Sequence, residues 1–166
     1  MTEKKKIYVA GAGGMLGDAI YKAFSDEYEL KCTDKWAVEN WVDFLDFRDY
    51  DRYRKDVSEF KPDYLFHIGA YTDLEWCEEH KDDTMLTNCM CVEYAVSIAN
   101  ELDIPIIYIS TAGIFDGEKE EYDELDIPNP LDMYAKGKYG GERYVVDNAN
   151  RYFILRAGWM MGGGPE

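Results

Sequence analysis

A tyrosine and a lysine four positions apart are the residues of this chain best suited to acid–base chemistry. Tyr134 and Lys138 lie at i and i+4 of a stretch with helical character, so a helix places both side chains on one face. A phenol has a pKa of about 10, but a neighbouring ammonium favours the phenolate and lowers that pKa. Such a pair can deliver a proton to a carbonyl oxygen while a hydride arrives at the carbon.

A hydroxyl at the end of a strand can hold that carbonyl oxygen in place. The apolar run Ile106-Ile107-Tyr108-Ile109 ends in Ser110 and Thr111, and the residues alone leave both as candidates. A chance pairing on a solvated helix face is the alternative for Tyr134 and Lys138. Their position, one helix after a strand that ends in two hydroxyl residues, favours the chemical interpretation.

A glycine cluster near the N-terminus predicts the cofactor that supplies the hydride. The run Ile7-Tyr8-Val9-Ala10 stops at Gly11, and Gly13, Gly14 and Gly17 follow. Strand, tight turn and helix in this order bring free N–H groups to a dinucleotide pyrophosphate. Gly11 would make the turn, Gly14 would admit the phosphates and Gly17 would let the helix pack closely. A plain glycine turn is the alternative.

Short apolar runs and longer amphipathic stretches alternate along the chain, which predicts a parallel sheet covered by helices on both faces. The fold class is therefore α/β, a doubly wound parallel sheet (Rossmann fold) in three layers, α/β/α. Strands are expected at 6–10, 29–33, 63–68, 105–110 and 152–156, with a short extended piece at 42–45. Helices are expected at 14–25, 48–60, 82–102 and 132–148. The acidic, proline-bearing stretch 114–130 is a candidate binding loop.

Composition and charge exclude several classes of function. The 166 residues suit one domain, and 34 acidic against 18 basic side chains give a net charge of −16. Nucleic-acid binding needs clustered Lys and Arg, so we expect no nucleic-acid partner. No apolar run approaches the roughly 20 residues of a membrane span, and the four cysteines lack a metal-binding spacing. We expect a cytoplasmic protein with free thiols and no metal.

Together these segments resemble the extended short-chain dehydrogenase/reductases, and within them the dTDP-4-dehydrorhamnose reductase group. The resemblance follows the family's order over nearly the whole chain. It rests on residues 11–17, Gly69-Ala70-Tyr71-Thr72-Asp73, Ile109-Ser110-Thr111, Phe115-Asp116-Gly117, 129–134, Lys138 with Gly141-Glu142, and Leu155-Arg156-Ala157-Gly158-Trp159.

The resemblance implies reduction of the 4-keto group of a nucleotide-linked deoxysugar with NADP(H) or NAD(H). It assigns proton donation to Tyr134, the nicotinamide ribose to Lys138 and orientation of the ketone to Thr111. It implies that Asp34 meets the adenosine ribose and that Lys35 is available to a 2′-phosphate. The remaining implied cofactor residues are Gly11, Gly13, Gly14, Met15, Leu16, Gly17, Asp46, Phe47, Gly69, Ala70, Tyr71 and Asn88, and Trp159 is implied to lie beside the sugar.

The sequence departs from this family in two respects. The family follows Ser-Thr with Asp-Tyr, whereas Ala112 and Gly113 stand here. Family members also continue into a smaller substrate-binding domain, so we expect residues 1–166 to be the NAD(P)-binding domain, with that second domain absent or truncated. A non-catalytic dinucleotide-binding or regulatory module, and an epimerase or dehydratase of the same superfamily, stay open as alternatives. Homodimerisation also stays open.

Overall fold

The computed structural model describes residues 4–37 and 39–162 and contains one parallel sheet of six strands. The strands are β1 (Lys6–Ala10), β2 (Glu29–Asp34), β3 (Val42–Phe44), β4 (Tyr64–His67), β5 (Ile106–Thr111) and β6 (Tyr152–Ala157). Their order across the sheet is β3-β2-β1-β4-β5-β6, and every neighbouring pair is parallel. The predicted doubly wound α/β fold is confirmed.

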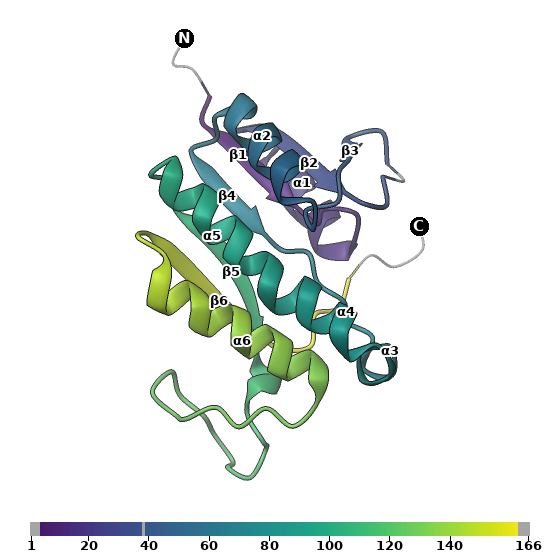
Figure 1. The fold of residues 1–166 in the computed structure, drawn as a ribbon, viewed down its shortest axis with the longest axis vertical. Helices are drawn as coiled ribbons and strands as arrows, with labels where there is room; N and C mark the ends of the chain where they lie inside the picture. Colours follow the sequence, from purple (N-terminus) through teal and green to yellow (C-terminus); the bar gives the residue numbers. More distant parts are fainter. Residues whose placement is uncertain (1–3, 38, 163–166) are drawn as a thin grey trace.

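The helices lie in the connections between strands and pack against the sheet (Figure 1). They are α1 (Met15–Phe24), α2 (Tyr50–Phe60), α3 (Leu74–Glu79), α4 (Lys81–Met85), α5 (Cys91–Glu101) and α6 (Met133–Asn148). The helix expected at 82–102 is interrupted by a π-helical turn, Leu86–Met90, between α4 and α5. Helix α3 was not predicted, because six residues are too few to show a helical period.

The core has one part on each face of the sheet. Helices α2, α5 and α6 cover one face and pack on a cluster that includes Tyr8, Leu65 and Tyr108. Helix α1 covers the other face, where Val9 and Ile20 belong to a second cluster. The adjacent β1 residues Tyr8 and Val9 are both fully buried although they point to opposite faces. Such two-sided burial explains why the strand shows no polar alternation.

Aspartates fix the starts of three helices. Asp49, Asp73 and Asp132 precede α2, α3 and α6, and each side chain accepts a hydrogen bond from a backbone N–H of the first turn. The bond from the Ala135 N–H to Asp132 is 2.7 Å long. Because α6 begins at a capped, defined position, Tyr134 stands in its first turn beside the carboxyl end of β5.

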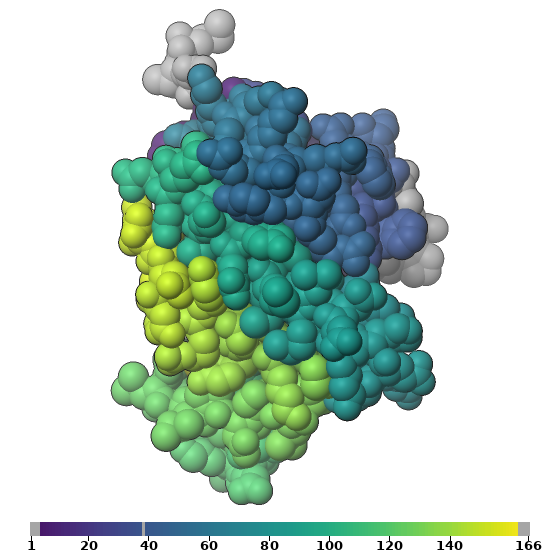
Figure 2. Space-filling model, in the orientation of Figure 1, coloured from purple at the N-terminus to yellow at the C-terminus, as the bar shows by residue number. Residues whose placement is uncertain are grey.

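The acidic loop between β5 and α6 has an ordered structure of its own and extends beyond the three layers (Figure 2). The Asp116 carboxylate accepts hydrogen bonds from Tyr122 Oη, Asn129 Nδ2 and the Glu118 N–H. These donors lower the pKa of Asp116 to about 2. The rings of Phe115 and Tyr122 stack at 4.4 Å. Residues of the loop, β6 and α6 together line a cavity of about 720 Å³. The expected role of the loop in binding stays a prediction.

Among the described helices, none has the length and apolar character that a bilayer crossing requires.

Candidate functional site

The turn after β1 brings two strand ends into contact. Gly11 has φ of 87°, and a side chain there would overlap the Cα of Gly69 at the end of β4. The N–H groups of Gly11 and Ala12 both donate to the carbonyl oxygen of Thr33, at 2.8 and 3.0 Å. The strand order reverses between β1 and β4, and this is where a doubly wound sheet opens a crevice for a ligand.

The following glycines shape a cradle at the start of α1. A Cβ on Gly17 would overlap the carbonyl oxygen of Ala12, so only glycine lets the helix lie this close to the turn. A Cβ on Gly14 would meet nothing within 4 Å, because this residue faces open space at the helix N-terminus. Gly14 has no side chain with which to cap that terminus, and the residues of this first turn line the crevice. The geometry fits a phosphate-bearing ligand.

Asp34 at the end of β2 closes the same cradle. Its Oδ2 accepts the Gly13 N–H at 3.0 Å and its Oδ1 accepts the Trp36 N–H at 2.8 Å. Gly13 is required at its position, because a Cβ would lie 2.8 Å from the Asp34 Cγ. Asp34 therefore holds the glycine turn and the end of β2 together.

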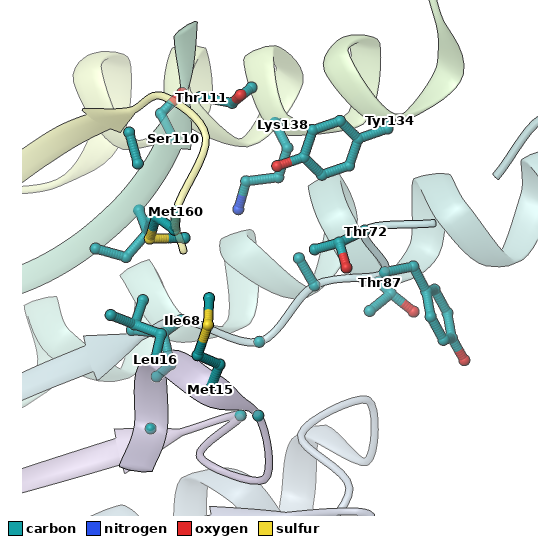
Figure 3. Close-up of a pocket in the computed structure, with 18 of the residues that line it drawn as sticks. Met15, Leu16, Ile68, Thr72, Thr87, Ser110, Thr111, Tyr134, Lys138 and Met160 are labelled. Carbon is teal, nitrogen blue, oxygen red and sulfur yellow. The ribbon is translucent and has the colours of Figure 1, made fainter. Parts of the chain in front are cut away.

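The acid–base residues lie on the other wall of the crevice. Tyr134 and Lys138 project from α6 into the cavity and face Met15, Leu16 and Met160 across it (Figure 3). Lys138 is buried, and its Nζ lies 4.3 Å from the centre of the Tyr108 ring.

Burial sets the protonation of both groups. It lowers the pKa of Lys138 to about 7, and the nearby carboxylate of Glu142 opposes this change. It raises the pKa of Tyr134, while the hydrogen bond with Thr111 acts in the opposite direction. The pKa of Tyr134 is therefore raised on balance, and the expectation that Lys138 lowers it stays a prediction.

Asn88 is the one predicted site residue that does not line the crevice. It lies fully buried in the π-helical turn, where its Oδ1 accepts the Tyr71 N–H at 2.8 Å and its Nδ2 donates to the Tyr71 carbonyl at 2.9 Å. These two bonds clamp the backbone after β4 from both sides. Asn88 therefore positions Tyr71 and does not reach into the crevice itself.

The crevice has a volume of about 720 Å³ and brings together all the other predicted site residues. Trp159 stands at its margin with 94% of its surface exposed. The structure adds lining residues that the sequence did not single out, among them Arg48, Thr87 and Met160. Arg48 directly follows the predicted Asp46 and Phe47, and this adjacency was the available signal. Thr87 carried no signal, because its exposure to the crevice depends on the π-helical turn.

Two buried hydroxyls in this lining have no hydrogen-bond partner among the described residues. They are Thr87 Oγ1 and Ser110 Oγ, on side chains that are 4% and 2% exposed. Buried polar groups are nearly always satisfied in folded proteins. Unpaired hydroxyls in the lining of the crevice are therefore suited to bind a polar ligand. The glycine cradle on the opposite wall is suited to the same kind of ligand.

Comparisons with known proteins identify similar chains. The sequence matches the family described as the RmlD substrate binding domain over residues 5–166. It is 31% identical over 165 residues to dTDP-4-dehydrorhamnose reductase of Aggregatibacter actinomycetemcomitans, with 95% of this chain and 52% of the relative covered. It is 32% identical over 164 residues to methionine adenosyltransferase 2 subunit beta of Danio rerio, with 97% and 50% covered.

The fold is also similar to that of a solved reductase. The crystal structure of dTDP-4-dehydrorhamnose reductase from Bacillus anthracis in complex with NADP superimposes with a TM-score of 0.89 at 28% identity. The match covers 99% of this chain and 57% of that one. The chain spans about half the length of the curated relatives it matches.

Proposed function

Because the chain belongs to the RmlD substrate binding domain family, we propose that it is an NAD(P)H-dependent reductase of a 4-keto nucleotide-linked deoxysugar. This match confirms the family predicted from the sequence, and dTDP-4-dehydrorhamnose reductase is among the proteins that the chain resembles. One observation carries the proposal: Thr111, Tyr134 and Lys138 line the same crevice as the glycine cradle. A dinucleotide bound in the cradle would then lie in the same crevice as a ketone beside Tyr134.

The cradle would hold the cofactor through backbone groups. The turn of Gly11 to Gly14 and the first N–H groups of α1 would receive the pyrophosphate, and Lys138 would meet the nicotinamide ribose. When bound, a reduced nicotinamide supplies the hydride. A net charge of −16 repels anions at long range, so these local donors have to supply the binding energy.

Tyr134 is suited to donate the proton that a reduced carbonyl oxygen needs. Burial raises its pKa, so the phenol carries its proton at neutral pH. The hydrogen bond with Thr111 directs the phenol oxygen toward the end of β5, where the same hydroxyl could meet the ketone. Lys138, with a pKa of about 7, can change protonation at neutral pH. It would stabilise the phenolate that remains after the transfer.

The proposal is tested by following NADPH absorbance with dTDP-4-dehydrorhamnose as substrate. We expect Tyr134→Phe to lower the rate by about 10²–10⁴-fold, since general acid catalysis contributes about that much. The matched control Tyr139→Phe removes a hydroxyl from the same helix outside the crevice lining and should retain the rate. Calorimetry with NADPH should give similar affinities for both variants. Full activity of Tyr134→Phe would contradict the mechanism.

A second candidate is a dinucleotide-binding regulatory module. It is supported by the 32% identity to methionine adenosyltransferase 2 subunit beta and by Ala112 and Gly113, where the reductases have Asp-Tyr. The same assay separates the two candidates. Cofactor binding without turnover of any 4-keto sugar nucleotide would favour the regulatory module.

A further inference from the structure

Helix α6 carries a buried carboxylate on the same face as the acid–base pair. Tyr134, Lys138 and Glu142 follow one another at steps of four residues, so their side chains lie along one side of the helix. Lys138 and Glu142 are each only 3% exposed. Burial of a carboxylate costs free energy unless charged or hydrogen-bonding partners compensate it. A carboxylate one turn after the lysine therefore needs a physical explanation.

Arg156 of β6 clamps this carboxylate from the side. Its Nη2 donates to Glu142 Oε1 at 2.7 Å, and its Nε donates to Oε1 at 3.2 Å and to Oε2 at 3.3 Å. The Cζ atom of Arg156 lies 5.4 Å from the centre of the Phe115 ring. Several charge-assisted bonds from a planar guanidinium fix the orientation of a carboxylate. Within the described residues, Glu142 therefore pairs with Arg156 and not with Lys138.

The clamp leaves the Lys138 ammonium where the chemistry needs it. The Nζ atom lies over the Tyr108 ring, and the side chain projects into the crevice beside Tyr134 (Figure 3). Spacing of i, i+4 on a helix also allows a direct ion pair between Lys138 and Glu142. Such a pair would draw the ammonium one turn away from the phenol. Because Arg156 holds the carboxylate, Glu142 acts on Lys138 through its field alone.

Titratable groups face this part of α6 from each element packed around it. They are His67 in β4, Tyr108 in β5, Cys89 in the π-helical turn, Arg156 in β6, and Tyr134 and Glu142 in α6 itself. Asp132 and the Cys77 thiol act on Tyr134, whose pKa both raise. Burial raises the pKa of the two tyrosines and of the Cys89 thiol, and it lowers the pKa of His67 to about 3. These four groups are therefore uncharged at neutral pH, and Glu142 is left to favour the ammonium against burial.

We propose that Glu142, clamped by Arg156, is a positioning residue of this site that keeps the Lys138 ammonium beside the phenol of Tyr134. The inference rests on the proposed function, since it adds a residue to the same proton transfer. In that step the O–H bond of Tyr134 breaks, an O–H bond forms on the reduced carbonyl oxygen, and a phenolate remains. An ammonium nearby stabilises the phenolate, and Glu142 maintains that charge without touching the reacting atoms.

The test follows the Lys138 side chain directly by NMR. The chain is labelled with ¹³C-lysine and titrated with pH, and the resonance that is missing from Lys138→Met is assigned to this residue. We expect Glu142→Gln, which keeps the size of the side chain, to lower the midpoint by about 1 pH unit, at the low end of the effect of a nearby opposite charge. Arg156→Met should raise the midpoint, because Glu142 can then pair directly with Lys138.

Matched variants separate this role from a structural one. Asp147→Asn removes a carboxylate from an exposed ion pair of the same helix and should leave the midpoint in place. The double variant Glu142→Leu with Arg156→Met replaces the buried pair by apolar side chains, a change that folded proteins often tolerate. It should lower the midpoint as Glu142→Gln does, even if the single variant folds poorly. An unchanged midpoint in both would overturn the proposal, and an unchanged or lower midpoint in Arg156→Met would overturn the clamp.

The rate of NADPH oxidation with dTDP-4-dehydrorhamnose gives a second readout. If the reaction needs the ammonium, the fall of kcat/KM at high pH should move to lower pH in Glu142→Gln, by the same interval as the NMR midpoint. A rate profile that stays in place while the midpoint moves would overturn the role of Glu142 and leave the proposed reductase standing. No turnover by the unchanged chain would overturn the proposed function and this role together.

Discussion

The buried lysine of the crevice should make the stability of this protein depend on pH in a defined direction. Burial holds the pKa of Lys138 at about 7 in the folded chain, whereas an unfolded chain keeps a lysine protonated to about pH 10. Between these values unfolding takes up a proton, so the free energy of unfolding rises with pH. From pH 7 to pH 9 the contribution of this residue is about 2 kcal/mol, at about 1.4 kcal/mol for each fully linked pH unit.

The assay is urea unfolding of the unchanged chain and of Lys138→Met at pH 7, 8 and 9. Methionine has a similar length and no charge, so the difference between the two chains isolates the lysine, and other titrating groups cancel. The unchanged chain should gain about 2 kcal/mol relative to the variant across this range. Lys136→Met removes an exposed lysine of the same helix and serves as the matched control for the substitution itself.

A constant difference for Lys138→Met would refute the reasoning. It would mean that the ammonium stays charged in the folded state, stabilised by Glu142 more strongly than burial destabilises it. The role of Lys138 as a group that changes protonation at neutral pH would then fail as well.

Three other predictions concern the scaffold of the site. Gly17→Ala should lower the free energy of unfolding by about 1–3 kcal/mol, because its methyl group would overlap a backbone carbonyl. Gly14→Ala should leave the free energy of unfolding unchanged and weaken NADPH binding. Urea unfolding measures the stability of both variants, and calorimetry measures their affinity for NADPH. Glu142→Ala should lower the free energy of unfolding by about 3 kcal/mol, because it breaks the ion pair with Arg156, in which the carboxylate is only 4% exposed. Asp147→Ala breaks an exposed ion pair on the same helix and should lower the free energy of unfolding by less than about 1 kcal/mol. A similar cost for the two would contradict the burial argument. The His67 imidazole should stay neutral down to about pH 4, since burial lowers its pKa to about 3. ¹⁵N NMR spectra recorded against pH measure this, and a titration of His67 near pH 6.5 would contradict the prediction.

Much of the fold follows from local patterns in the sequence. The apolar runs, the glycine turn at Gly11 and the i, i+4 spacing of Tyr134 and Lys138 are all properties of neighbouring residues. Parallel strands then bring their carboxyl ends to one edge without further information. These patterns were sufficient to predict the order of the strands along the chain, the layers and the two walls of the crevice. They did not predict the π-helical turn, since nothing in the period of residues 82–102 distinguishes it.

The chemistry of the site depended on contacts between residues far apart in the chain. Lys35 meets Tyr71 across 36 positions, and Asn88 clamps Tyr71 across 17. No local pattern encodes such pairs, so the sequence assigned Asn88 to the cofactor and did not single out Arg48. The pKa of Lys138 likewise depends on how many atoms surround it in the folded chain. The sequence by itself determined which groups are present and on which elements they lie. Only the tertiary structure decided their protonation and their partners, because desolvation and charge pairing act through space.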